Sequence, residues 1–204
     1  MKKRIVTFLL ALGAFALASV NAAEPSAVTK TAIFAGGCFW CMQPPFDHAK
    51  GVTKTVVGYC GGKESDANYS AVSAHKTAHR ESIEVTYNPA EISYDQLLDI
   101  FWRNINPTQA DGQFSDIGLS YQAAIFYGND DEKKVAEVSK EKLGKSGKFQ
   151  KPIATEILPA MKFFPAEEYH QKYYLKNSAE FEAYHVGSGR VSFLEKVWGK
   201  SAKE

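Results

Sequence analysis

The sequence predicts one α+β domain, a two-layer structure in which a mixed β-sheet carries its helices on one side. Short β-rich segments alternate with helical segments, and their order mixes crossover connections with antiparallel neighbours. No internal repeat or low-complexity block marks a second domain. We therefore place a single domain at residues 31–200, after a short tether at 23–30.

Apolar runs and turn residues define three strands and two helices in the first half of this domain. In chain order they are a strand at 32–35, a helix at 38–48, strands at 52–59 and 80–87, and a helix at 93–105. Gly36 and Gly37 separate the first strand from the first helix, and Ser93 is a good N-cap for the second.

The second half begins with a polar, irregular stretch at 106–120 and continues with further strands and helices. They are a strand at 123–127, a helix at 130–143, a strand at 153–158 and a helix at 166–176. The whole order is that of a split β-α-β plait with a ferredoxin-like core. From Asn177 we expect an irregular tail, whose apolar end at 193–198 packs back onto the body.

The N-terminus has the layout of a cleavable secretory signal. Three basic residues precede an apolar run at 5–20, and small residues follow at 20–23. Cleavage after Ala22 would remove a signal peptide at 1–22. An uncleaved membrane anchor is the alternative, but the apolar run is short for one. We expect export, to a bacterial periplasm, and no stable membrane association after cleavage.

The charge balance argues against a nucleic-acid partner. The chain has 24 Lys and Arg against 23 Asp and Glu, and three of the basic residues belong to the predicted signal. Phosphate binding needs concentrated basic residues. The densest basic run, at 140–151, is more simply a solvated helix end and loop. We expect a monomer that binds no nucleic acid.

The chain has three cysteines, Cys38, Cys41 and Cys60. An odd number, confined to one N-terminal segment, excludes a scaffold of stabilising disulfides. Cys38 lies at the predicted helix start, where the helix dipole should lower its pKa. Cys41 lies one turn further on, so the pair can cycle between dithiol and disulfide. Inert buried cysteines or half a metal site are weaker alternatives; no second ligand pair exists, and we predict no metal.

An acidic residue lies on the apolar face of a predicted strand. Ile83, Val85 and Tyr87 alternate onto one face, and Glu81 and His79 fall on the same face. The Glu81 carboxyl then pairs with a buried cation or has its pKa raised by burial, which would make it a proton donor. A solvated strand start fits the pattern equally well. His79 is better read as a structural hydrogen-bonding partner than as a base.

Four aromatic residues have both a structural and a functional interpretation. Phe39 and Trp40 beside the thiol are ordinary core residues or the wall of an apolar pocket for a sulfur-methyl group. Tyr69 and Tyr121 lie in loop-like sequence where a phenol can face a cleft. Spacing alone favours the structural interpretation for both tyrosines.

Five motifs in order resemble the methionine sulfoxide reductase A family, and they span nearly the whole chain after the predicted signal. They lie at 37–40, 58–62, 77–81, 116–121 and 169–174. The resemblance implies that Cys38 attacks the sulfur of an S-epimer methionine sulfoxide. Glu81, with Tyr69 and Tyr121, would then protonate and hold the oxygen. Cys38 is left as a sulfenic acid, which a second thiol converts to a disulfide.

The resemblance also implies the binding partners. Phe39 and Trp40 would hold the substrate methyl group, with Asp116 and His79 also at the substrate site. The substrates would be oxidised proteins or peptides that contain methionine sulfoxide. No cofactor is implied, since a thioredoxin-like dithiol donor would supply the electrons.

The chain departs from the family pattern at its resolving cysteine. Many relatives have Gly after the Trp and resolving cysteines near the C-terminus, whereas here Cys41 replaces the Gly and no cysteine follows Cys60. Cys41 is therefore the first candidate resolver, and Cys60 is either a second resolver or only a small buried residue. Phe181 also stands where a third site Tyr is common, with Tyr184 as a possible substitute.

Two other functions compete with the reductase. A general thiol–disulfide oxidoreductase would use the Cys38 and Cys41 pair, but it would not need Glu81 and two tyrosines. An exported binding module would recognise methionine-rich surfaces through Phe39 and Trp40, and would not need the thiol at all.

Overall fold

The computed structural model describes residues 28–199. The predicted signal peptide at 1–22 and most of the predicted tether lie outside the described residues. The first strand, β1 (Lys30–Ala35), begins one residue before the expected start of the domain. Within residues 28–199, no helix has the length and apolar character needed to cross a membrane.

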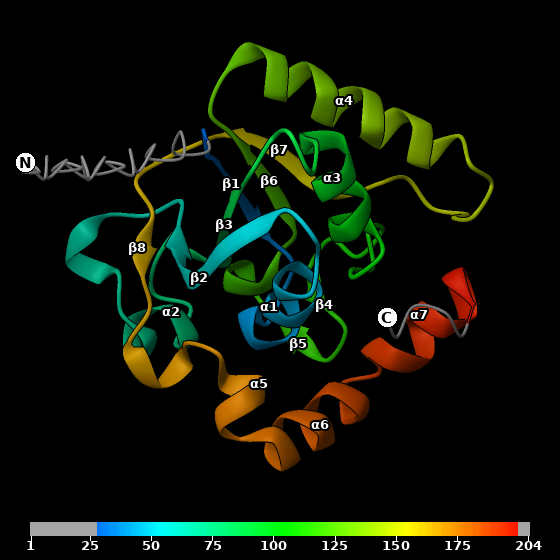
Figure 1. Ribbon diagram of the computed structural model, residues 1–204. Helices are drawn as coiled ribbons and strands as arrows, with labels where there is room; N and C mark the ends of the chain where they lie inside the picture. The colour runs from blue at the N-terminus through cyan, green and yellow to red at the C-terminus, as the bar shows by residue number, and fades with distance from the viewer. Residues whose placement is uncertain (1–27, 200–204) are drawn as a thin grey trace, which may run out of the picture.

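A six-stranded mixed sheet lies at the centre of the molecule, in the order β7-β6-β1-β3-β2-β8 (Figure 1). The other strands are β2 (Val52–Cys60), β3 (Arg80–Tyr87), β6 (Ala124–Tyr127), β7 (Glu156–Pro159) and β8 (Phe164–Pro165). Only the β6–β7 pair among these is parallel. The four central strands, β6-β1-β3-β2, form the predicted split β-α-β plait.

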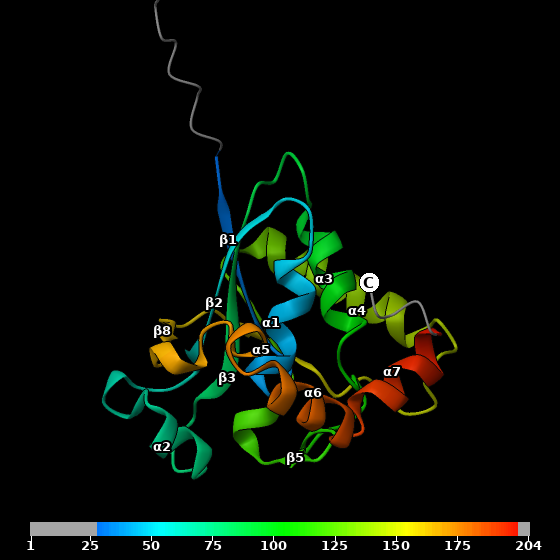
Figure 2. The ribbon, with the colours of Figure 1, turned by 60° about the horizontal axis from the view of Figure 1, so that its bottom comes forward.

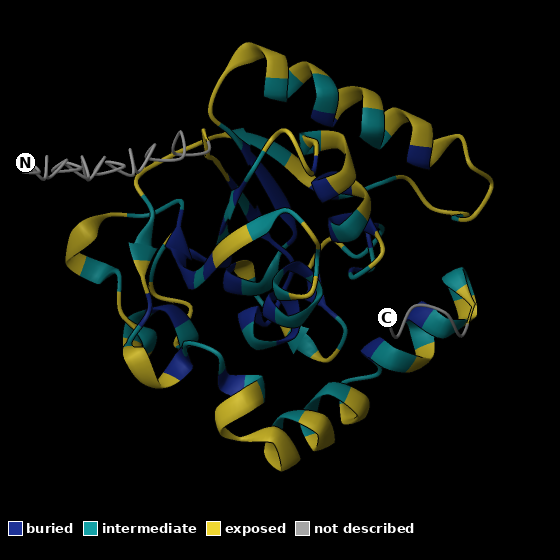
Figure 3. Cartoon of the chain, viewed as in Figure 1, coloured by how far each residue is buried: buried dark blue, intermediate teal, exposed yellow. Residues whose placement is uncertain are grey.

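Three helices cover one face of the sheet: α1 (Phe39–Asp47), α3 (Tyr94–Trp102) and α4 (Asp130–Gly144). Phe34 of β1 stacks on Phe46 and on Phe101, with ring centroids 5.3 Å apart in both pairs. Figure 3 shows this interior as the buried centre of the molecule, with the outer face of α4 exposed. The predicted arrangement of helices on one side of a mixed sheet is confirmed.

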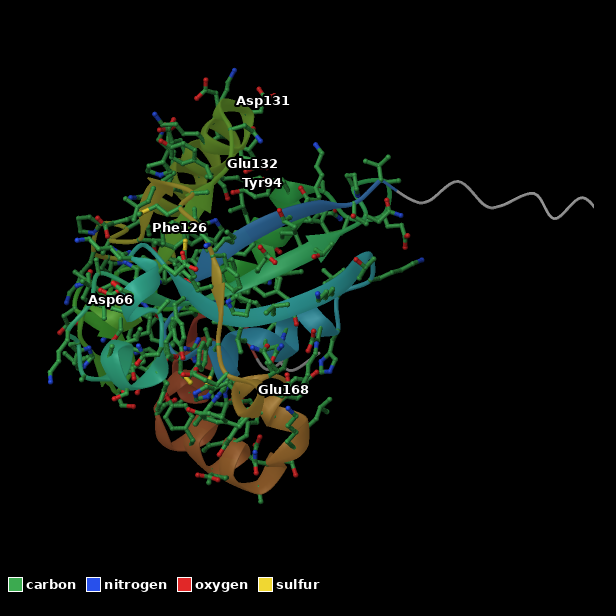
Figure 4. All side chains as sticks on the ribbon, turned by 90° about the vertical axis from the view of Figure 1, so that its left-hand side faces the viewer. Asp66, Tyr94, Phe126, Asp131, Glu132 and Glu168 are labelled. Carbon is green, nitrogen blue, oxygen red and sulfur yellow. The ribbon has the colours of Figure 1, made fainter. Side chains whose placement is uncertain are left out.

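The opposite face of the sheet holds a smaller apolar cluster. Its buried members are Ala35, Cys60, Ala124 and Phe126, and Phe163 packs against them. Phe126 is labelled in Figure 4. Successive residues of a strand point to opposite faces, so Cys60 and its neighbour Tyr59 lie on different sides of the sheet.

The connections hold short elements that the sequence pattern does not predict. Between β2 and β3 lie a 3₁₀ turn (Glu64–Asp66) and α2 (Tyr69–Ser73). The expected irregular stretch before β6 contains the small hairpin β4 (Gly112–Gln113) and β5 (Asp116–Ile117), then a 3₁₀ turn (Leu119–Tyr121). These connections are long, and they carry the predicted site residues Tyr69, Asp116 and Tyr121.

The structure corrects two predictions for the C-terminal third. The expected helix at 166–176 is a 3₁₀ turn (Glu168–His170) and a short α5 (Tyr173–Lys176), interrupted at Lys172 by a left-handed φ of 53°. The expected irregular tail forms α6 (Ser178–Gly187) and α7 (Arg190–Trp198) (Figure 2). The tail does pack back, because Leu194 is buried and Trp198 contacts the main core.

Candidate active site

A tight turn places Cys38 at the start of α1. Gly37 has a φ of +82°, and a Cβ atom there would lie 2.5 Å from Cβ of Gln113. Only glycine fits this turn, because other residues avoid that conformation and would clash. Cys38 is the N-cap residue of α1 and is 6% exposed.

Glu81 lies beneath this helix start. The β2–β3 register pairs it with Tyr59 on the face that α1 covers, and its side chain is buried. The backbone N–H of Phe39 donates to Glu81 Oε2 at 3.0 Å. Burial raises the pKa of Glu81 well above its ordinary value, and the nearby Cys38 charge acts in the same direction. A solvated strand start is thereby excluded, and the carboxyl can hold a proton at neutral pH.

The sequence predicts a lowered pKa for Cys38, and this prediction is wrong. Burial raises the pKa of this thiol well above its ordinary value, and the hydrogen-bonding contact with Cys41 raises it further. The Cys38 side chain caps none of the described amides of the first turn, since the Phe39 amide donates to Glu81 instead. The carboxyl of Glu81 thus occupies the favourable anion position that we expected for the thiolate.

Cys41 lies among groups that favour its ionised form. Its pKa is lowered by the hydrogen bond from Cys38 and by the positive charge of Arg190, against the effect of burial. Its Sγ lies 3.3 Å from Nδ1 of His185, on α6. Arg190 begins α7 and donates from Nη2 to the Gly36 carbonyl at 3.0 Å, directly behind the active-site turn. The C-terminal helices therefore place an imidazole and a guanidinium group near the thiol pair.

Tyr184 of α6 joins Cys38 to Asp116. Its hydroxyl donates to Asp116 Oδ2 and also makes a hydrogen-bonding contact with Cys38. Burial raises the pKa of Tyr184, and the Cys38 charge does so as well, so this phenol keeps its proton. Asp116 accepts from the Tyr184 hydroxyl and so orients it beside Cys38.

Two further phenols lie around the acid. Burial raises the pKa of Tyr69, and the charges of Glu81 and Cys38 add to the effect. The pKa of Tyr121 is raised by burial, by Glu81 and by Asp116. Both phenols therefore interact electrostatically with Glu81 and Cys38, although they come from two separate connections.

The aromatic residues after Cys38 occupy different environments. Phe39 is 1% exposed and packs in the core against Tyr59. Trp40 is partly exposed, stacks on Tyr173 with ring centroids 3.8 Å apart, and donates from Nε1 to Nδ1 of His170 at 3.0 Å. Trp40 is thus the member of the pair that can offer a ring face to a ligand.

His170 is a site residue for which the sequence analysis proposed no role. Since Nδ1 accepts from Trp40, the ring carries its proton on Nε2 when neutral. That Nε2 is buried and has no hydrogen-bond partner within the described part of the chain. Burial lowers the pKa of His170, and its ring centroid lies 4.5 Å from that of Tyr69. The sequence indicated this residue only through its position in the motif at 169–174.

Two predicted residues lie apart from this cluster. His79 holds the glycine turn: Nδ1 accepts from the Gly62 amide at 3.2 Å, and Nε2 lies 2.8 Å from the Lys63 carbonyl. Asp66, labelled in Figure 4, lies 3.3 Å from the same Nε2. Cys60 points to the opposite face of the sheet, and its Sγ lies 3.6 Å from the Met161 carbonyl.

The arrangement combines a buried thiol, a carboxyl with a raised pKa, neighbouring phenols and a second thiol. Such a set can transfer an oxygen atom to Cys38 and then expel it as water. Among residues 28–199, no group of three His, Cys, Asp or Glu side chains is placed to hold a metal ion.

Comparison with known proteins decides the family. Residues 30–202 match the family described as peptide methionine sulfoxide reductase. The chain belongs to this family. The peptide methionine sulfoxide reductase MsrA of Bacillus pumilus is 52% identical over 167 residues, which cover 82% of this chain and 94% of the relative. That of Bacillus subtilis is 50% identical over 168 residues, covering 82% and 95%.

Solved structures agree with this assignment. Reduced Mxr1 from Saccharomyces cerevisiae has a TM-score of 0.68 at 33% identity, covering 76% of this chain and 88% of that one. Methionine sulfoxide reductase A of Corynebacterium diphtheriae has a TM-score of 0.65 at 30% identity, covering 76% and 77%. The protein is a thiol-dependent peptide-methionine (S)-S-oxide reductase, and the family assignment decides against the two competing functions.

Proposed function

We propose that Cys38 is the nucleophile and Glu81 the proton donor of this reductase. Removal of the oxygen from a sulfoxide needs a thiolate to attack the sulfur and an acid to protonate the departing oxygen. The observation that carries the proposal is the buried Glu81 carboxyl, bonded to the Phe39 amide beside Cys38. The phenols of Tyr69, Tyr121 and Tyr184 interact electrostatically with Cys38 and can hold the oxygen.

Cys38 and Glu81 titrate as a coupled pair, and the active state has one proton on the pair. Each charge opposes ionisation of the other, so the pair titrates together and the doubly charged state is disfavoured. When Cys38 ionises, Glu81 keeps its proton, and this state contains both the nucleophile and the acid. In the balanced step, the oxygen leaves the substrate sulfur and bonds to Cys38, yielding methionine and a Cys38 sulfenic acid.

Cys41 is the proposed resolving thiol. It lies one helical turn from Cys38, with which it exchanges a hydrogen bond. Cys60 packs on the opposite face of the sheet, and burial raises its pKa, so it is neither near Cys38 nor readily ionised. A local Cys38–Cys41 disulfide therefore needs the smaller rearrangement.

A thioredoxin-like dithiol is the proposed reductant, and oxidised proteins or peptides are the proposed substrates. The support for the reductant is a structure of Mxr1 in complex with Trx2, which has a TM-score of 0.50 to this chain at 25% identity. Phe39 and Trp40 would receive the substrate methyl group, with Trp40 offering its partly exposed ring. We also propose that the enzyme is a monomer and, on the basis of the N-terminal pattern, that it is exported. Sequencing the N-terminus of the mature protein tests the cleavage after Ala22.

Single-turnover kinetics test the central pair. Reduced protein without added reductant should form one methionine per molecule from an S-sulfoxide peptide. Glu81→Ala should slow this step while the number of titratable thiols stays the same. An unchanged rate in this variant would remove Glu81 from the mechanism.

A further inference from the structure

We propose that His185 is the general base that deprotonates Cys41 for disulfide formation. The inference rests on the resolving role proposed for Cys41. The Nδ1 atom of His185 lies 3.3 Å from Cys41 Sγ, a distance within hydrogen-bonding range for sulfur. His185 touches the reacting sulfur directly, and it belongs to α6, 144 residues further along the chain.

The contact between Cys41 and His185 can be a hydrogen bond both before and after the proton is transferred. With its proton on Nε2, the imidazole accepts the Cys41 S–H at Nδ1; after transfer, the imidazolium donates to the thiolate across the same distance. Figure 2 shows α6 close to the end of α1 where the cysteines lie. An imidazole has a pKa near neutrality, so it can accept this proton and return it.

Packing fixes the orientation of the ring. Phe181, one turn earlier on α6, stacks on His185 with ring centroids 5.2 Å apart and an interplanar angle of 25°. His185 is only partly buried, so it can exchange protons with solvent between turnovers. Phe181, which departs from the family pattern, therefore acts as a positioning residue for this base.

The need for a base arises from the preceding step. In the resting enzyme, a hydrogen bond from Cys38 and the charge of Arg190 lower the pKa of Cys41. Oxidation of Cys38 to a sulfenic acid removes its S–H donor just before Cys41 must ionise. Arg190 remains to stabilise the thiolate, while Asp116 and Glu81 oppose it. His185 is the neighbouring group that can remove the proton.

The step balances in atoms and electrons. The Cys41 S–H bond breaks, and its proton goes to Nδ1 of His185. The thiolate pair forms the S–S bond as the Cys38 S–O bond breaks, and the leaving hydroxide takes up the proton as water. Cys41 sulfur is oxidised, Cys38 sulfur is reduced by the same amount, and the imidazole is regenerated.

Quenched-flow analysis of one turnover tests the role. Reduced protein is mixed with an S-sulfoxide peptide, and three species are measured: methionine, the disulfide, and Cys38 sulfenic acid trapped with a cyclic diketone. His185→Ala removes the base, whereas His185→Asn keeps a hydrogen-bonding atom near the Nδ1 position but cannot accept a proton. His48→Gln, a change on the exposed far end of α1, is the matched control.

In both His185 variants, the rate of disulfide formation should fall at least about tenfold more than the rate of methionine formation. Cys38 sulfenic acid should accumulate as a result. The control should match the wild type. A smaller effect in His185→Asn would overturn the proposal, since hydrogen bonding alone would then suffice. The methionine burst measures the folded, active fraction of each variant. A wild type without a burst would refute the proposed function instead.

Discussion

The Cys38–Cys41 pair and Cys60 are equally hidden from solvent, yet only the pair has the surroundings of reactive thiols. All three cysteines are buried, at 6%, 2% and 0% exposure. Cys60 lies among Ala35, Ala124 and Phe126, and burial raises its pKa. The pair instead lies against ionisable groups from strands, connections and C-terminal helices.

Neighbouring titratable groups, more than burial, therefore distinguish Cys38 from Cys60. Burial also raises the pKa of Cys38, as it does at Cys60. At Cys38, however, a phenol and a second thiol make hydrogen-bonding contacts with the sulfur, and a carboxyl interacts with it electrostatically. Reactivity at Cys38 thus comes from a coupled group of titratable side chains.

The largest effect is expected from removing the nucleophile. Cys38→Ser should lower methionine formation by about a thousandfold or more, because a neutral hydroxyl is a much poorer nucleophile than a thiolate. Methionine release from an S-sulfoxide peptide measures it. Comparable activity in this variant would move the chemistry away from Cys38.

Next in size is the loss of the acid. Glu81→Gln keeps the shape and the contact with the Phe39 amide but cannot donate the carboxyl proton. First-turnover methionine formation should slow by about a hundredfold to ten-thousandfold, the usual range for general acid catalysis. Stopped-time assays under single-turnover conditions measure this loss, and wild-type rates in E81Q would contradict the assigned role.

Removing the proposed resolving thiol should affect disulfide formation but not the formation of the first methionine. Cys41→Ser should still yield a first methionine but lower the steady-state rate with a dithiol protein donor by about tenfold or more. Trapping of Cys38 sulfenic acid measures the stalled intermediate. Full steady-state turnover with no trapped intermediate would show that another thiol resolves Cys38.

The pH profile should show the coupled pair directly. Methionine formation needs Cys38 ionised and Glu81 protonated, so the rate rises as the pair loses its first proton and falls as it loses the second. Because the pKa of Glu81 is raised, the proton donor survives well above its ordinary range. Well beyond the second pKa, the rate should fall about tenfold per pH unit. Glu81→Gln should lose this alkaline limb.

The smallest effect is expected at Cys60. Cys60→Ala should leave turnover unchanged and lower the free energy of unfolding by about 1–2 kcal/mol, since it removes a buried sulfur from a small apolar cluster. Denaturant unfolding measures the stability. A large loss of turnover with normal stability would give Cys60 a part in catalysis.

Regular strands and the main helices could be predicted because their apolar residues repeat with a clear period. Helix α6 could not be predicted, since none of its side chains, all of which are described, is fully buried. The predicted helix at 166–176 fails for a local reason. Its apolar residues belong to separate short pieces, and the left-handed backbone at Lys172 interrupts them.

The site could be predicted only as far as local sequence determines it. Cys38 and Glu81 lie in recognisable motifs, and strand alternation places Glu81 on the covered face. The pKa direction of Cys38 was wrong because burial raises the pKa of this thiol, and the Phe39 amide donates to a residue 42 positions away and not to Cys38. The contacts of Cys41 with His185 and Arg190 depend on tertiary packing, which no spacing in the sequence reveals.

Peptide mapping after a single turnover directly tests whether Cys41 is the thiol that resolves Cys38. Reduced protein is oxidised by one equivalent of an S-sulfoxide peptide, alkylated, digested and analysed by mass spectrometry. The expected product is a disulfide between Cys38 and Cys41, with Cys60 recovered as an alkylated thiol. A disulfide between Cys38 and Cys60 would contradict it.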